Sequence, residues 1–135
     1  MAYPPEWVSE GVLAKSSRPG HPSKTGISQS IVDSWIAEAK DMGIKSIICF
    51  LSGDQLPFYS ELPNGLLSYY EEAGFEVAHI PQTDYTNPPL SDENIRRAIS
   101  RFDELEKPVL IHCSAGISRT RMAVRKILDL RLSEV

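Results

Sequence analysis

The apolar residues of this chain recur with helical spacing in four separate segments. The clearest pattern runs from Ile27 to Ala39 and ends at Gly43, a residue typical of helix ends. A second segment precedes Gly74, and a third follows Ser91, which is a favourable N-cap residue. The pattern predicts amphipathic helices over residues 27–43, 65–73, 91–106 and 120–132.

Short apolar runs, rich in β-branched residues, lie between these helices. The runs 45–51, 75–80 and 109–111 predict buried strands, and the loosely alternating residues 7–14 predict a further strand or a short hairpin. Loops rich in proline or polar residues, at 16–22, 52–64 and 81–90, separate the elements. Strands that alternate with helices indicate an α/β fold with a central, mainly parallel sheet of four to five strands flanked by helices.

Ligands of such sheets bind beyond the carboxyl ends of the strands. The loops 81–90 and 112–119 each follow a predicted strand and therefore lie at that edge of the sheet. The pattern thus predicts one functional site to which both loops contribute.

The composition narrows the class of protein. A length of 135 residues fits a single domain, 1–135. A net charge of −4 provides no basic surface for nucleic acid or an anionic membrane, so we expect neither as a partner. Two cysteines are too few for a disulfide-stapled secreted domain. The first residues do not resemble a signal peptide, and the longest apolar stretch, 47–51, is too short to span a bilayer. We therefore expect a reduced, cytoplasmic protein.

The segment from Ile111 to Thr120 carries the candidate chemistry, because it runs from a strand end into a helix start. Backbone N–H groups in such a loop form an anion-binding nest, and the following helix adds its positive dipole end. Gly116 permits a tight backbone path, and Arg119 offers a planar pair of donors for phosphate oxygens. Cys113 lies in the same positive potential, so we expect it to be a nucleophilic thiolate at neutral pH.

The spacing between the cysteine and the arginine is a weak signal alone, but its context is specific. Residues 112–120, with the sequence HCSAGISRT, resemble the signature loop of the protein tyrosine phosphatase superfamily, and most closely that of its small dual-specificity branch. From Gly43 onward the layout is also similar to that of kinase-associated phosphatase. The resemblance implies a hydrolase that removes phosphate from phosphotyrosine through a phosphocysteine intermediate, with phosphoserine and phosphothreonine left open. It implies no cofactor and no metal, and as substrate a phosphorylated protein or a small phosphoester.

The resemblance also implies roles for individual residues. Cys113 is the expected nucleophile, and Asp84 the expected general acid that protonates the leaving oxygen. Ser118 is expected to assist loss of the thiol in the second step, and His112 to order the loop. The residues expected to bind phosphate are Ser114, Ala115, Gly116, Ile117, Ser118 and Arg119, with His112 and Thr120 in support.

Some of these residues have alternative interpretations. Asp84 also fits an ordinary turn aspartate, and the rival carboxylate Asp92 is best explained by its place at a helix start. His21 and His79 form no zinc-ligand spacing with Cys113. A phosphate-binding module without catalysis and a sulfur transferase of the rhodanese type are the competing functions. The cysteine, the arginine and the aspartate together disfavour both.

The chain departs from the family pattern at two places. Arg121 stands where relatives usually have glycine, and we expect it to alter helix packing or add positive charge near the pocket. Relatives also continue with one or two further helices, so we expect a minimal or truncated domain, or one completed by a partner, as a monomer or homodimer. Cys49 is interpreted as a core residue. A redox pair with Cys113 is the alternative, because some relatives pair the catalytic cysteine with a nearby one.

Overall fold

A five-stranded sheet forms the centre of the computed structural model, which describes residues 3–132. Its strands are β1 (Glu6–Ser9), β2 (Leu13–Ser16), β3 (Ser46–Cys49), β4 (Glu76–His79) and β5 (Val109–His112), in the order β1-β2-β5-β3-β4. β1 and β2 form a hairpin, one of the two alternatives predicted for residues 7–14, and β2, β5, β3 and β4 are all parallel. The predicted α/β fold is therefore confirmed.

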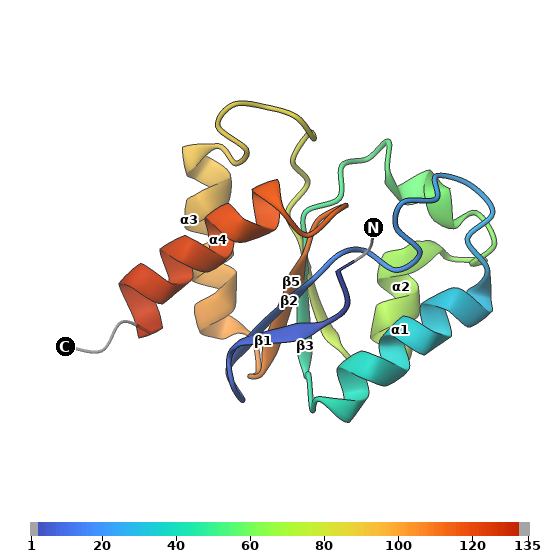
Figure 1. The fold of residues 1–135 in the computed structure, drawn as a ribbon, viewed down its shortest axis with the longest axis horizontal. Coiled ribbons are helices and arrows are strands. Elements are labelled where there is room, and N and C mark those ends of the chain that lie inside the picture. The colour runs from blue at the N-terminus through green and yellow to red at the C-terminus, as the bar shows by residue number, and fades with distance from the viewer. Residues whose placement is uncertain (1–2, 133–135) are drawn as a thin grey trace.

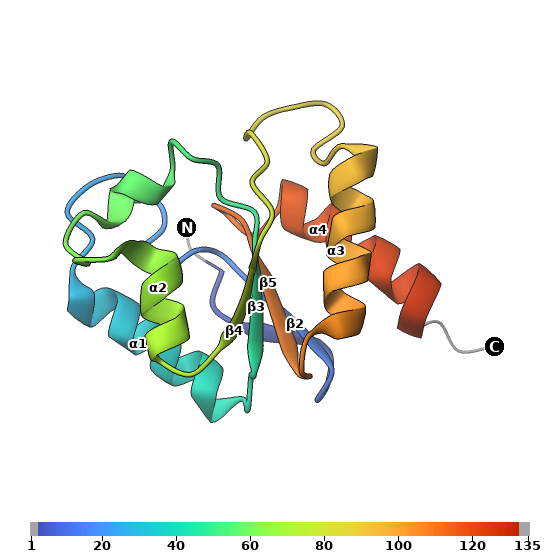
Figure 2. The same ribbon diagram turned by 180° about the vertical axis from the view of Figure 1, so that it is seen from behind.

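The helices cover both faces of this sheet. α1 (Gln29–Asp41) and α2 (Gly65–Glu72) lie on one face, and α3 (Asp92–Glu104) and α4 (Ser118–Ile127) lie on the other (Figures 1 and 2). Ser28 and Ser91 cap α1 and α3, each accepting a hydrogen bond from a backbone N–H three residues later. α4 continues into a π-helical turn, η2 (Leu128–Leu132).

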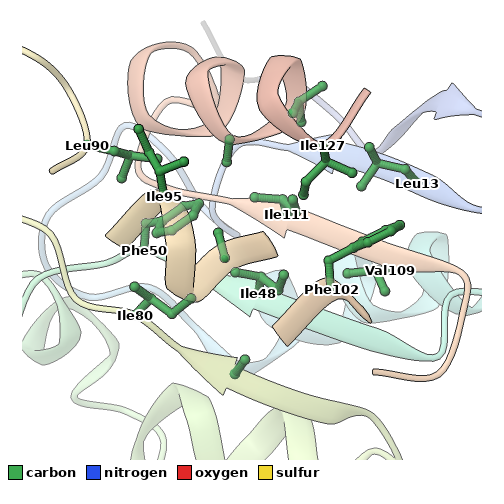
Figure 3. Close-up of a cluster of buried hydrophobic side chains, with 14 of the residues drawn as sticks. Leu13, Ile48, Phe50, Ile80, Leu90, Ile95, Phe102, Val109, Ile111 and Ile127 are labelled. Carbon is green, nitrogen blue, oxygen red and sulfur yellow. The ribbon is translucent and has the colours of Figure 1, made fainter. Parts of the chain in front are cut away.

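Two hydrophobic clusters hold these layers together. Side chains of successive β-strand residues point to opposite faces. Ile48 accordingly packs beneath α3 and α4, whereas Ile47 and Cys49 pack beneath α1 and α2. Figure 3 shows the first cluster, in which Phe102 of α3 and Ile127 of α4 lie against the sheet. The interpretation of Cys49 as a core residue agrees with its complete burial.

Most predicted elements are shorter by a few residues at their ends than the sequence prediction, and three further differences concern the site. The expected loop 52–64 contains a 3-10 helix, η1 (Leu56–Tyr59), which has a proline in its first turn and buries Tyr59. β5 extends through His112, because that residue pairs with Ser16 of β2 and Cys49 of β3. α4 begins at Ser118 rather than at Thr120. Within residues 3–132, no helix has the length and apolar character needed to cross a membrane.

Candidate active site

The loop between β5 and α4 lies at the carboxyl end of the sheet, beside the loops that follow β3 and β4 (Figure 1). Cys113 begins this loop and is 2% exposed. Gly116 has a φ of +78°, and a Cβ atom there would lie 2.6 Å from the carbonyl oxygen of Ser16. Only glycine fits at this position, both in its backbone conformation and in the space that the neighbouring chain leaves.

Arg119, in the first turn of α4, is the most constrained side chain of the site and is 1% exposed. Its Nη1 donates to the carbonyl oxygens of Phe50 and Gln82, at 3.0 and 2.7 Å, and to Gln55 Oε1 at 3.1 Å. Its Nη2 lies 3.0 Å from Asp84 Oδ2 as an ion pair, without the alignment of a hydrogen bond. Neither Nη2 nor Nε has a hydrogen-bond partner among the described residues. These two donors can bind two oxygens of one anion.

Asp84 lies where the resemblance implies an acid, on the loop after β4. Besides its ion pair with Arg119, Asp84 Oδ2 accepts a hydrogen bond of 3.2 Å from Gln55 Nε2. Its Oδ1 accepts one of 3.0 Å from the backbone N–H of Tyr85. The structure therefore brings this carboxylate and the arginine of the loop together.

The loop that carries Asp84 is attached to α3 through Gln82. Gln82 Oε1 accepts hydrogen bonds from Ser91 N at 3.1 Å and from Asn94 Nδ2 at 2.9 Å. Asp92 lies exposed in the first turn of α3, where a negative charge is favourable, in agreement with its interpretation as a helix-start residue.

His112 is completely buried, and its hydrogen bonds determine its protonation. Its Nδ1 lies 2.9 Å from the carbonyl oxygen of Cys113, which can only accept, so Nδ1 carries the hydrogen. Burial lowers the pKa of His112 to about 4, so the ring is neutral and Nε2 accepts from Tyr70 OH at 2.9 Å. His112 is thus bonded, as a neutral ring, to the backbone carbonyl oxygen at the start of the loop. Trp35 packs against both aromatic partners of this pair.

The two hydroxyl residues that flank Arg119 differ in their surroundings. Ser118 is exposed, and no hydrogen bond of its hydroxyl is found within residues 3–132. Thr120 is completely buried, and its Oγ1 has no hydrogen-bond partner in the described part of the chain. The role that we expected for Ser118 stays a prediction. The buried Thr120 hydroxyl, which is costly to leave without a partner, is a second candidate for it.

Sequence reasoning missed two residues of the site, Gln55 and Arg18. Gln55 connects the catalytic candidates through its two amide atoms, since Oε1 accepts from Arg119 and Nε2 donates to Asp84. Arg18 is buried and its Nε donates to Ser114 Oγ at 3.1 Å. Both residues lie in segments that read as ordinary polar loops, and no local pattern marks either of them.

The remaining expectations from the sequence concern a redox pair between Cys49 and Cys113, a metal site, and the effect of Arg121 near the pocket. Cys49 and Cys113 are both free thiols, and they belong to clusters on opposite faces of the sheet. Burial raises the pKa of Cys49 to about 12, which makes it a poor resolving thiol.

No group of three His, Cys, Asp or Glu side chains between residues 3 and 132 could hold a metal ion. Arg121 is exposed on α4 and lines a small cavity of about 170 Å³ with Lys15 and Ile117.

The site thus brings together a thiol at the base of a tight loop, an arginine on the following helix and a carboxylate beside it. These are the groups that the resemblance to the protein tyrosine phosphatase superfamily implies. The model of the family described as "Polymorphic toxin system, DSP-PTPase phosphatase" matches residues 22–130. The chain belongs to this family. The predicted membership of the dual-specificity branch is thereby confirmed.

Comparison with individual proteins agrees with this family. The chain is 32% identical over 50 residues to the dual specificity protein phosphatase OPG106 of vaccinia virus, a match that covers 36% of this chain and 29% of the viral protein. The chain thus matches less than a third of the length of this viral relative.

Among solved structures, a mutant form of Tk-PTP shares 22% identity and a TM-score of 0.66, covering 95% of this chain and 73% of that one. A putative phosphatase (DUF442) from Shewanella putrefaciens shares 17% identity and a TM-score of 0.64, covering 99% of this chain and 76% of that one. Kinase associated phosphatase shares 20% identity and a TM-score of 0.60, covering 88% of this chain and 75% of that one. These likenesses extend over nearly the whole fold.

Proposed function

We propose that this chain hydrolyses phosphate monoesters through a phosphocysteine intermediate on Cys113. The observation that carries the proposal is the buried guanidinium of Arg119, whose Nε and Nη2 have no hydrogen-bond partner in the described residues. Nη1 is bonded to three oxygens from the loops after β3 and β4, so the orientation of the guanidinium is fixed. The two remaining donors and the amides of residues 114–119 suit the oxygens of a phosphoryl group.

In the first step Cys113 Sγ attacks phosphorus as a thiolate. The S–P bond forms while the bond from phosphorus to the ester oxygen breaks, and the phosphoryl oxygens stay bound to Arg119 and the loop amides. Asp84, in its acid form, gives its proton to the leaving oxygen. A positioned acid typically accelerates such a step by about 10²–10⁴-fold.

In the second step water attacks phosphorus and the S–P bond breaks. Asp84, now a carboxylate, takes a proton from the water, and Cys113 leaves as a thiolate. We assign the hydroxyl that assists this departure to Thr120, because its buried Oγ1 lacks an acceptor in the described structure, whereas Ser118 is exposed. Inorganic phosphate is the product, and the enzyme returns to its starting state.

The proposed substrates are phosphotyrosine residues of proteins, with phosphoserine and phosphothreonine as further candidates. The family description refers to polymorphic toxin systems, and we propose that this chain is the phosphatase of such a system. Because the reaction needs a reduced Cys113, we propose that it acts in the cytoplasm, where thiols stay reduced. A single catalytic domain over 1–135, a monomer or homodimer, and the absence of nucleic acid and membrane partners stay predictions.

The test is hydrolysis of aryl phosphates by the wild type, Cys113→Ser and Asp84→Asn. We expect Cys113→Ser to lose turnover completely, and equal rates for it and the wild type would refute the mechanism. Asp84→Asn should slow esters with poor leaving groups far more than esters with good ones, because only the former need the proton. Equal slowing of both would remove Asp84 from the acid role. Thiosulfate turnover above aryl phosphate turnover would instead favour the sulfur transferase.

A further inference from the structure

Arg18 is one of the largest fully buried side chains of the protein, with 1% of its surface exposed. It lies two residues after the end of β2, on the segment that packs against the loop between β5 and α4. The proposed mechanism does not use it. Arginine keeps its positive charge in proteins, so this charge is buried permanently.

The contacts of Arg18 connect it to Ser114, the residue that follows the nucleophile. Its backbone N–H donates to the Ser114 carbonyl oxygen at 2.9 Å, and its Nε donates to Ser114 Oγ at 3.1 Å. Nη1 lies 3.5 Å from Tyr59 OH, which itself donates to the Pro19 carbonyl oxygen at 2.6 Å. The guanidinium also lies over the ring of Phe58, 4.8 Å from its centroid. Arg18 is therefore fixed in position at the start of the loop.

No carboxylate compensates this charge. Among the ion pairs of residues 3–132, none includes Arg18, and the other buried guanidinium, Arg119, pairs with Asp84 alone. Burying an ion without a counter-charge is strongly unfavourable. The site thus holds two buried guanidinium groups beside one partly buried carboxylate, Asp84, which leaves an excess of buried positive charge near Cys113. This excess suits a thiolate and a phosphate dianion.

The positive charge of Arg18 affects the pKa values of neighbouring groups in the site. It contributes to the lowered pKa of His112, after burial and Arg119, and to the lowered pKa of His21. The other titratable or charged groups around Arg18 and Cys113 are His21, Cys49, Asp54, Tyr59, Tyr70, His79, Asp84, His112 and Arg119. Two of them are carboxylates: Asp84 pairs with Arg119, and Asp54 is exposed to solvent.

We propose that Arg18 is a positioning residue of the phosphatase site, which holds Ser114 in place and supplies a second buried positive charge for the bound phosphate and the Cys113 thiolate. This inference rests on the proposed function. The electrostatic contribution distinguishes it from a merely structural arginine, whose replacement would lower stability without changing how the folded protein binds anions.

The test compares Arg18→Met with Arg18→Lys and with Arg121→Met, which removes an exposed arginine of α4. Iodoacetamide labelling of Cys113, located by peptide mass, gives the rate of its alkylation at neutral pH. Protection by inorganic phosphate gives a dissociation constant that needs no turnover. For Arg18→Met we expect phosphate to bind about tenfold more weakly and the labelling rate to fall about tenfold. Arg18→Lys should stay within about threefold of the wild type, as should Arg121→Met, whose charge is screened by solvent.

Circular dichroism confirms that each variant is folded, and Arg18→Gln, which is polar but neutral, replaces Arg18→Met if that variant does not fold. Unchanged phosphate binding and an unchanged labelling rate in the folded neutral variant would refute the proposal. An equal loss in Arg121→Met would refute it too, since net charge alone would then explain the effect. Failure of the proposed function would appear separately, as an absence of aryl phosphate hydrolysis by the wild type.

Discussion

The buried ring of His112 predicts a loss of stability under mildly acidic conditions. Burial lowers its pKa from 6.5 to about 4 in the folded protein, whereas an unfolded chain returns it to the ordinary value. Between these two values the unfolded state binds a proton that the folded state does not. The free energy of unfolding therefore falls as the pH is lowered through this window.

The size of the effect follows from the two pKa values. Between pH 7 and pH 5, the linkage relation gives a loss of about 2 kcal/mol in the free energy of unfolding. With a typical dependence on urea, this loss lowers the unfolding midpoint by about 1 M. Fluorescence of Trp35, which is buried beside His112, reports the transition in a urea titration at each pH. Asp54 and Asp103, whose pKa values are lowered from 3.8, titrate below this window.

Two variants distinguish the contribution of His112 to this pH dependence of stability from that of the other histidines. His112→Asn removes the titrating ring, so its free energy of unfolding should depend on pH by about 2 kcal/mol less than that of the wild type. His21→Asn is the matched control and should keep most of the dependence, because His21 is only partly buried. The reasoning is wrong if the wild type is equally stable at pH 7 and pH 5, or if His112→Asn retains the full loss.

Two further predictions concern the loop and the first turn of α4. Gly116→Ala should lower the free energy of unfolding by about 2–4 kcal/mol, because its Cβ would lie 2.6 Å from the Ser16 carbonyl oxygen at a φ of +78°. Gly53→Ala, whose Cβ would meet nothing within 4 Å, should change it little, and similar losses in urea titrations would contradict the argument. Thr120→Ala should slow turnover about 10- to 100-fold and accumulate phosphocysteine, detectable by intact mass, whereas Ser118→Ala should not. The opposite ranking would return the assisting role to Ser118.

Local patterns predicted most of the fold, because helix spacing, β-branched runs and caps act over a few residues. Ser91 illustrates this, since its side chain accepts the expected hydrogen bond from Asn94 N. η1 was missed because it is only four residues long, contains a proline and buries a single residue, Tyr59, so it has no helical apolar pattern. Helix α4 begins earlier than its apolar pattern, because its first turn is occupied by the polar residues of the site.

The residues of the candidate site also fall into two groups, those that local sequence patterns could predict and those that they could not. Cys113, Arg119 and Asp84 could be proposed because the loop sequence and the following helix are adjacent in the chain, and because a known family has the same pattern. Gln55 and Arg18 could not, since each acts through a partner at least 64 residues away in the sequence, Arg119 for Gln55 and Ser114 for Arg18. Such contacts exist only once the strands have paired.

The pairing register of the sheet explains how these distant residues meet. Ser16 of β2 and Cys49 of β3 both lie opposite His112 of β5. The backbone hydrogen bonding between β2 and β5 continues beyond the ends of both strands, where Arg18 N donates to the Ser114 carbonyl oxygen.

On the β3 side, Phe50 N donates to the His112 carbonyl oxygen, and the Phe50 carbonyl oxygen then accepts from Arg119 Nη1. Because a shift of one residue would reverse which side chains face each helix layer, the two hydrophobic clusters hold this register. The same packing that stabilises the core therefore sets the positions of both buried arginines around Cys113.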